Sequence, residues 1–264
     1  MTRHLVFSDQ KKINITVGIV SYNTSVLTLR KLIESLKKSD CSLKIVLLCN
    51  SQNEIYQSEL FQISKEYQIN LLNNQPNRGF GAGHNTIAQE FQAEWYVCCN
   101  PDVMVRPDSI SKLIQFADEK PDAVMLMPRV VSENGTVQPL ARRHLTLITW
   151  IHRQLWRLMP RLFKPFEISF DYHKSQPVDF VTGCFFAIRH EKFRRLGGFD
   201  EQFFLYSEDA DLSYRASKIG SNYFVATSEI THFWTTDKTR NHRIIFQELK
   251  SLIYYFGKHN LWLS

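Results

Sequence analysis

The sequence predicts an α/β protein whose central, mostly parallel sheet is flanked by helices. Strand-like and helix-like apolar patterns alternate through the first half of the chain, as they do in consecutive βαβ units. Polar motifs follow two of the strand patterns directly, at residues 49–51 and 100–102. Because open sheets bind ligands at the carboxyl ends of their strands, these motifs indicate where the site lies.

The expected strands are short β-branched or apolar runs, at residues 13–20, 43–48, 69–72, 95–99 and 123–127. Apolar residues at helical spacing predict helices between them, at residues 26–36, 54–67 and 110–117. The alternation stops between about residues 142 and 177. Strands are expected again at 180–188 and 223–225, and helices at 191–196, 209–219 and 241–257.

The composition indicates one folded domain over residues 1–264. Its 44% hydrophobic and 22% charged residues allow a sizeable core. We expect a nucleotide-binding half at about 13–130 and a catalytic, acceptor-binding half at about 131–264. The net charge of +6 favours an anionic partner, either a nucleotide, a lipid headgroup or a nucleic acid. Nucleic acid is disfavoured, because no recognised nucleic-acid motif occurs.

The cysteines and the apolar runs indicate a cytoplasmic protein. The five cysteines include no C-x-x-C pair, and three of them lie in apolar strand patterns, so reduced core thiols are expected rather than zinc ligands. Residues 1–12 lack the apolar segment of a signal peptide. No apolar run approaches the roughly 20 residues that span a bilayer. Any membrane contact is therefore expected to be peripheral.

A glycine-rich motif, Asn-Arg-Gly-Phe-Gly-Ala-Gly-His-Asn, occupies residues 77–85. Glycine at every second position lets the backbone approach a ligand closely. A helix is expected to follow, and its N-terminus would favour phosphate. A glycine-rich turn without a ligand remains the alternative, since the pattern alone is weak.

Two further motifs suggest a metal site. Asp102 ends Asn-Pro-Asp after a strand pattern, where a carboxylate can coordinate a hard cation. The same three residues are also common in turns. His232 ends another apolar stretch, and a lone histidine there has a structural role more often than a ligand role.

Acidic residues gather in the segment from Gly197 to Leu212. Glu208 and Asp209 are expected to begin a helix, where the helix dipole favours negative charge. The apolar run before them predicts a partly buried cleft. Burial raises the pKa of a carboxylate and suits it to proton abstraction. A capping cluster on a solvated helix is the alternative.

The segment at residues 142–166 is basic and apolar, and no acid occurs in it. From Leu147 the apolar positions 151, 155, 158 and 162 recur at helical spacing. This predicts an amphipathic segment in the headgroup layer of an anionic membrane. A helix that packs its apolar face on the domain is the alternative. The basic residues are Arg142, Arg143, Arg153, Arg157, Arg161 and Lys164.

Together these motifs resemble family 2 glycosyltransferases with the GT-A fold, and in particular bacterial rhamnosyltransferases of O-antigen and other cell-surface polysaccharide assembly. The resemblance covers nearly the whole chain, through residues 20–23, 77–85, 100–102, 183, 197–211, 232 and 258–260. It implies an inverting enzyme that needs Mg²⁺ or Mn²⁺. The enzyme would move a sugar, L-rhamnose from dTDP-L-rhamnose, to a polyprenyl-diphosphate-linked saccharide at the inner face of the cytoplasmic membrane.

The resemblance also implies residue roles. The metal ligands would be Asp102 and His232, and the catalytic base would be Asp209, with Glu208 next in line. Acceptor contacts would come from Gly183 and Asp211. The donor-binding residues would be Ser21, Tyr22, Asn23, Asn50, Asn77, Gly79, Gly81, Asn85 and Asn100.

One position departs from the family pattern. Family members commonly have Asp-Asn-x-Ser after the second strand, where the aspartate contacts the nucleotide base. Here the segment begins with Cys49, and a thiol is a poor acceptor for a base N–H. Base recognition would then fall to another group, such as the backbone. The alternatives are a hexosyltransferase that uses a UDP-sugar, such as UDP-glucose or UDP-galactose, and an inactive GT-A-like protein at a membrane surface.

Overall fold

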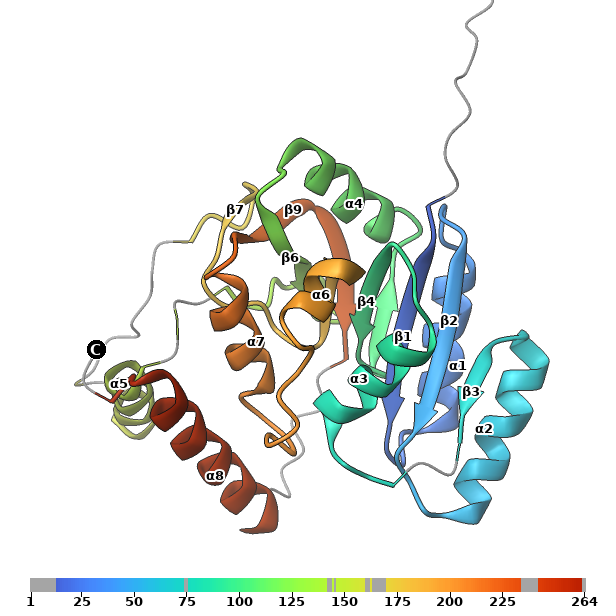
Figure 1. Ribbon diagram of the computed structural model, residues 1–264, viewed down its shortest axis with the longest axis horizontal. Coiled ribbons are helices and arrows are strands. Elements are labelled where there is room, and N and C mark those ends of the chain that lie inside the picture. Colours follow the sequence, from blue (N-terminus) through green and yellow to red (C-terminus); the bar gives the residue numbers. More distant parts are fainter. Residues whose placement is uncertain are drawn as a thin grey trace, which may run out of the picture.

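The computed structural model of the chain describes residues 13–73, 76–141, 144, 146–159, 162, 170–233 and 242–262. Within these residues nine strands form one sheet, in the order β3-β2-β1-β4-β8-β6-β9-β5, and β7 pairs with β9. Helices cover both faces of the sheet (Figure 1). The predicted α/β class is confirmed.

The first half of the chain builds the parallel part of the sheet. Every residue of β1 and β4 is buried, which explains their continuous apolar runs. The parallel strands are β1 (Ile15–Ser21), β2 (Leu43–Cys49), β3 (Asn70–Leu72) and β4 (Trp95–Cys99). The helices between them are α1 (Val26–Lys37), α2 (Glu54–Tyr67) and α3 (Phe80–Glu90).

The second half completes the sheet with strands of both directions. Strand β8 runs antiparallel between β4 and β6, while β9 runs parallel to β6. These strands are β5 (Val103–Val105), β6 (Ala123–Val131), β7 (Gln176–Pro177), β8 (Phe185–Arg189) and β9 (Ser221–His232). The helices are α4 (Ser109–Glu119), α5 (Leu147–Leu158), α6 (His190–Arg195), α7 (Glu208–Ala216) and α8 (His242–His259).

Three strands differ clearly from their expected bounds, and one of them is β6, which continues to Val131 beyond the expected end at residue 127. The strand expected at 180–188 begins only at Phe185, because residues 178–184 form the loop that precedes it. Strand β9 continues to His232, well beyond the expected end at residue 225. Its pairing with β6 shifts register between Pro128 and Arg129. The exposed Thr227 at this irregularity interrupts the apolar pattern.

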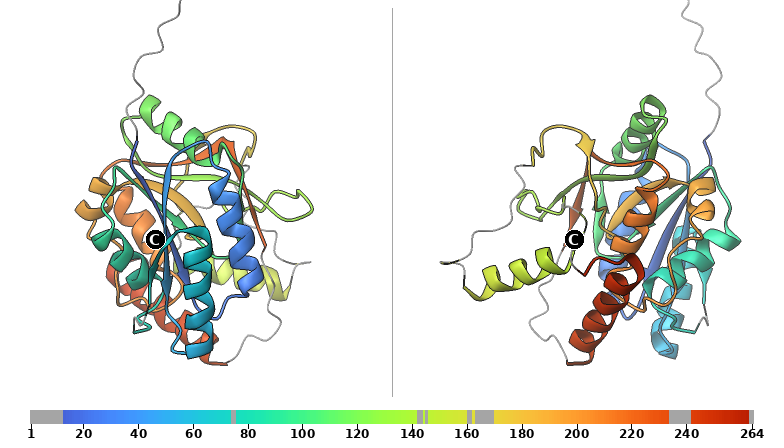
Figure 2. Two further views of the ribbon diagram at one scale, coloured as in Figure 1. Left: turned by 90° about the vertical axis from the view of Figure 1, so that its right-hand side faces the viewer. Right: turned by 60° about the vertical axis from the view of Figure 1, so that its left-hand side comes forward.

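The helices form two layers on the sheet. Helices α1 and α2 cover one face, and α3, α6 and α7 cover the other (Figure 1 and Figure 2). The main core fills the space between these layers. A second, smaller cluster lies under α8 and includes Phe203, Tyr255 and Phe256, with Leu147 and Trp150 of α5 packed against it.

Helix α8 buries only some of its apolar residues. Leu252 and Phe256 are buried, but Ile245, Leu249 and Ile253 are exposed. The helix contacts the second cluster mainly through its C-terminal half.

Candidate active site

The parallel strands bring the polar motifs together at one edge of the sheet. Asn50 follows β2, and its backbone N–H donates to the carbonyl of Ser21 at the end of β1 (2.9 Å). Its side-chain amide donates to the carbonyl of Gly79 at the start of α3 (3.1 Å). Residues from three separate motifs therefore border one region.

Helix α2 forms one wall of this region through Tyr56, which the sequence analysis missed. The Tyr56 hydroxyl lies 2.5 Å from Ser21 Oγ and accepts from the backbone N–H of Thr24 (3.0 Å). Ser51 Oγ donates to Asn23 Oδ1 (2.6 Å). Ser21 and Asn23 are thus fixed by hydrogen bonds, whereas Tyr22 is 61% exposed and free to meet a ligand.

Cys49 faces the core rather than the open side of this edge. Its side chain is buried, and the thiol donates to the carbonyl of Ser51 (3.6 Å). Burial raises the pKa of the thiol. The cysteine therefore acts as a small apolar core residue here.

Gly79 caps α3 in a conformation that disfavours other residues. Its φ is 98°, and a Cβ at this position would lie 2.1 Å from the carbonyl oxygen of Phe204. Asn77 Oδ1 accepts from the Gly79 N–H (3.0 Å). The Phe204 carbonyl accepts from the N–H of Phe80 (3.2 Å). The motif is thereby joined to the acidic segment.

The other two glycines of the motif lie inside the first turn of α3, so the helix begins earlier than the pattern suggested. A Cβ on Gly81 would lie 2.7 Å from Phe199 Cβ, and one on Gly83 would lie 2.8 Å from Val20 Cγ2. Asn85 accepts from the N–H of Phe199 and donates to its carbonyl, both at 2.8 Å. These contacts favour a role in holding the Phe199 loop over direct contact with a donor.

The β5–β9 pairing brings the two predicted metal ligands together. Val103 pairs with His232, so Asp102 lies beside the histidine, with Asp102 Oδ1 3.3 Å from His232 Nε2. Asp102 Oδ1 is buried and accepts no hydrogen bond from the described residues. A buried carboxylate oxygen that accepts no hydrogen bond is suited to bind a cation.

A metal at Asp102 and His232 would need further ligands from outside the described residues. Among the residues that the structure describes, no cluster of three or more His, Cys, Asp or Glu could hold an ion. A site with two protein ligands fits a metal that is completed by the oxygens of a diphosphate.

Asp209 lies in the first turn of α7 and faces Gly183. Its Oδ2 accepts from the Gly183 N–H (3.0 Å), and a Cβ at Gly183 would lie 3.3 Å from Asp209 Cβ. The two residues before α7, Tyr206 and Ser207, have φ of 69° and 65°. Non-glycine residues pay about 1–3 kcal/mol for such a backbone, and this strain is typical of active sites.

Glu208 is buried beside Asp209 and holds its proton at neutral pH. Burial, followed by the charge of Asp209, raises the Glu208 pKa to about 8. Its Oε2 has no hydrogen-bond partner within the described chain, which also favours the neutral form. Asp209 is therefore the better candidate for a base at pH 7.

One backbone segment connects the metal pair with the base. The carbonyl of Cys184 accepts from the N–H of Asn100 (2.8 Å), and the adjacent Gly183 binds Asp209. Burial raises the pKa of the Cys184 thiol to about 12, and the charges of Asp102 and Asp209 both contribute. Both carboxylates therefore lie near the same thiol.

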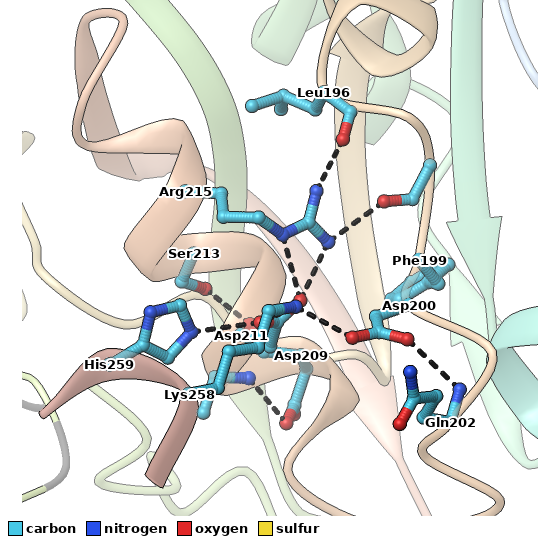
Figure 3. A network of polar contacts seen from close by, with 12 residues as sticks. Leu196, Phe199, Asp200, Gln202, Asp209, Asp211, Ser213, Arg215, Lys258 and His259 are labelled. Atoms are coloured by element: carbon cyan, nitrogen blue, oxygen red, sulfur yellow. Dashed lines mark hydrogen bonds and ion pairs between the residues drawn. The ribbon is translucent and has the colours of Figure 1, made fainter. Parts of the chain in front are cut away.

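Asp211 is buried in a network of cations (Figure 3). Its carboxylate pairs with Arg215 of the same helix (2.7 Å) and with Lys258 (2.6 Å) and His259 (2.8 Å) of α8. Lys258 also pairs with Asp200 (2.7 Å). A fully buried carboxylate with three partners favours a positioning role over the predicted acceptor contact. The Asp211–Arg215 spacing of four residues was a signal that the sequence analysis did not use.

Two known proteins are similar to this chain in sequence. Over 213 residues, the chain is 29% identical to N-acetylglucosaminyl-diphospho-decaprenol L-rhamnosyltransferase of Mycobacterium tuberculosis, covering 74% of this chain and 69% of that protein. It is 24% identical over 244 residues to rhamnosyltransferase WbbL of Escherichia coli K12, covering 88% and 89%.

A solved structure and a family match extend the comparison. The structure of GalNAc-T7 with UDP, GalNAc and Mn²⁺ superposes with a TM-score of 0.72 at 17% identity. The superposed region covers 93% of this chain and 48% of the GalNAc-T7 chain. Such neighbours identify the fold as GT-A. Residues 16–197 match Glycosyl transferase family 2. The chain therefore belongs to glycosyltransferase family 2, and it is a sugar-transferring enzyme.

Proposed function

We propose that this enzyme is an inverting, metal-dependent rhamnosyltransferase that moves L-rhamnose from dTDP-L-rhamnose to a polyprenyl-diphosphate-linked saccharide. The observation that carries the proposal is the segment Gly183–Cys184, whose backbone hydrogen-bonds to Asp209 and to Asn100, two residues before Asp102. A donor held at Asp102 would present its anomeric carbon to an acceptor at Asp209.

The choice of sugar and acceptor rests on two relatives. The mycobacterial protein is named for L-rhamnosyl transfer to a diphospho-decaprenol-linked N-acetylglucosamine, and WbbL is also named a rhamnosyltransferase. The edge of the sheet at Ser21, Asn23 and Asn50 is polar, as the binding of a nucleotide requires. Because Cys49 is buried, base recognition falls to the backbone and to these neighbours.

The chemistry follows from a single base. Asp209 takes the proton of the acceptor hydroxyl as its oxygen bonds to the anomeric carbon, while the bond from that carbon to the diphosphate breaks. The Gly183 N–H donates to Asp209 Oδ2 and orients this carboxylate at the N-terminus of α7 before transfer. The protonated Glu208 adds no second negative charge beside it. One displacement of this kind inverts the anomeric centre.

Asp102 and His232 would hold the metal ion, Mg²⁺ or Mn²⁺. The ion would supply positive charge against the departing diphosphate. The GalNAc-T7 structure holds UDP together with Mn²⁺. Asp102 Oδ1, buried and without a hydrogen bond from the described residues, is the atom that we expect to bind the ion.

A lipid-linked acceptor requires the enzyme to work at the inner face of the cytoplasmic membrane. No helix in the described part of the chain combines the length and apolarity needed to cross a bilayer. Contact is therefore proposed to be peripheral, through the basic and apolar segment at residues 142–166.

Two variants test the proposed roles. Asp209→Asn should still bind donor but should transfer sugar about 100- to 10,000-fold more slowly. Asp102→Asn should lose metal-dependent donor binding in calorimetry while its unfolding midpoint stays unchanged. Near-normal transfer by Asp209→Asn, or unchanged donor binding by Asp102→Asn, would refute the corresponding role.

A donor screen tests the sugar nucleotide. Hydrolysis of dTDP-, UDP- and GDP-sugars is compared with Mg²⁺ or Mn²⁺ present, and we expect dTDP-L-rhamnose to be preferred. Preference for a UDP-hexose would select the hexosyltransferase instead. Binding of no sugar nucleotide would indicate an inactive GT-A-like protein.

A further inference from the structure

Exposed apolar side chains concentrate on two helices. Ten of the seventeen exposed large hydrophobic residues among those described lie between Ile148 and Leu162 or between Ile245 and Trp262. None of the described side chains of α5 is fully buried. On α8, Ile245, Leu249 and Ile253 recur every four residues, and Phe246 beside them is 68% exposed. Such a patch indicates an interaction surface.

The start of α5 and the end of α8 meet at one end of the molecule, and the two helices diverge from there (Figure 2). The backbone N–H of Leu147, which begins α5, donates to the carbonyl of Leu261 just after α8 (3.2 Å). Both helices stand apart from the sheet, and α8 lies at the end toward which β1 and β2 point (Figure 1 and Figure 2). We define their exposed residues as the α5–α8 face: Ile148, Ile151, Leu158, Met159, Leu162, Ile245, Phe246, Leu249, Ile253 and Trp262.

The charge of the segments that carry this face identifies its partner. Residues 142–166 and 242–264 contain nine Lys or Arg and one Glu, whereas the rest of the chain has 23 Lys or Arg and 25 Asp or Glu. The positive charge of the protein therefore belongs to these two segments. A net positive charge in the segments that carry the exposed apolar residues matches an anionic lipid surface, while a second copy of the same segments would bring like charges together.

Helix α8 also contacts the segment that carries the base. Lys258 and His259 pair with Asp211, and Lys258 pairs with Asp200. Ser251 Oγ donates to the carbonyl of Leu205 (2.9 Å). These four contacts flank Asp209 on both sides in the sequence. A surface on which α8 rests would therefore lie close to the base.

We propose that the α5–α8 face docks on an anionic bilayer, with α8 as an apolar anchor in addition to the segment at residues 142–166. Ile245, Phe246, Leu249 and Ile253 enter the headgroup boundary, and the exposed Lys250 meets lipid phosphates. This rests on the proposed function in one respect, because a lipid-linked acceptor would then reach Asp209 from the membrane on which α8 lies.

The test measures sedimentation of the full chain with vesicles of phosphatidylglycerol or of phosphatidylcholine. The α8 variant is Phe246→Glu/Leu249→Glu/Ile253→Glu, whose sites are 68%, 42% and 61% exposed. The matched control is Leu27→Glu/Ile55→Glu/Phe61→Glu on α1 and α2, at 63%, 74% and 48%. Circular dichroism and the urea midpoint check that each variant is folded.

We expect wild type and control to bind phosphatidylglycerol vesicles at low salt and to bind phosphatidylcholine far more weakly. Partitioning of the α8 variant should fall by about 100-fold, because three apolar anchors become anions. Equal binding by the α8 variant and wild type would overturn the proposal. The proposal would also be overturned if wild type formed a dimer, did not bind vesicles, and only the α8 variant were monomeric. Donor hydrolysis in solution is measured separately, so a failure of the proposed function is distinguished from a failure of docking.

Discussion

Replacement of Glu208 by Gln tests the protonation state of the acidic pair Glu208 and Asp209 at the start of α7. Glu208 is 6% exposed, and burial beside Asp209 raises its pKa from 4.5 to about 8. In the unfolded chain the same group releases its proton at an ordinary pKa. Between about pH 4.5 and pH 8 the folded protein therefore binds one proton more than the unfolded protein.

The sign and size of the effect follow from that difference. A carboxyl with a raised folded pKa contributes stability that is fully present below pH 4.5 and lost as pH rises through 8. Across this window the free energy of unfolding should fall by about 1.4 kcal/mol per pH unit through Glu208 alone. Above pH 8 this contribution levels off. Gln cannot ionise, so the Glu208→Gln variant should lack this slope.

Urea unfolding at several pH values between 5.5 and 8.5 measures the slope for wild type and variant. Glu59→Gln, at an exposed position of α2, is the matched control and should follow wild type. Glu208→Gln should also keep transfer within about tenfold, since it resembles the protonated acid. Parallel pH profiles for wild type and Glu208→Gln would refute the raised pKa. A large loss of transfer with normal donor binding would move the base to Glu208.

Three other variants test the supports of the site. Gly79→Ala should lower the free energy of unfolding by about 2 kcal/mol. The new Cβ would lie 2.1 Å from the Phe204 carbonyl oxygen, at a φ of 98°. An unchanged urea midpoint would contradict this. Asp211→Asn leaves Arg215 and Lys258 without their buried carboxylate and His259 without its charged hydrogen-bond partner. It should lower the free energy of unfolding by about 3–5 kcal/mol, measured in the same way, whereas a loss below about 1 kcal/mol would mean that the network is not coupled. Cys49→Asp should destabilise the protein, because the position is buried; normal stability with altered preference among dTDP-, UDP- and GDP-sugars would show that this position reads the base.

The parallel half of the fold was predictable because its patterns are local. Strands β1 and β4 are buried along their whole length, so their sequences are continuous apolar runs. Helix α2 begins at Glu54 as expected, and Asn53 caps it by accepting from the N–H of Tyr56 (3.1 Å). Where burial and capping are encoded in neighbouring residues, sequence periodicity is sufficient.

The remaining features depend on contacts between distant segments. Strand β5 has three residues and exists through its pairing with β9. The close packing of Gly81 on Phe199 joins residues more than a hundred positions apart. The role of Asp211 is visible only when α8 brings Lys258 and His259 against it. No local pattern contains this information.

Because β9 extends to His232, the site needs residues well beyond the region that matches the family. The family match ends at residue 197, but His232 comes from the end of β9, and Asp209 lies on the helix before it. Strand β9 also covers the edge of β6. A fragment cut at the family boundary would keep Asp102 while losing the proposed base, the proposed second metal ligand and the strand that pairs with β6. During synthesis, too, the reactive centre is complete only after the last strand has left the ribosome.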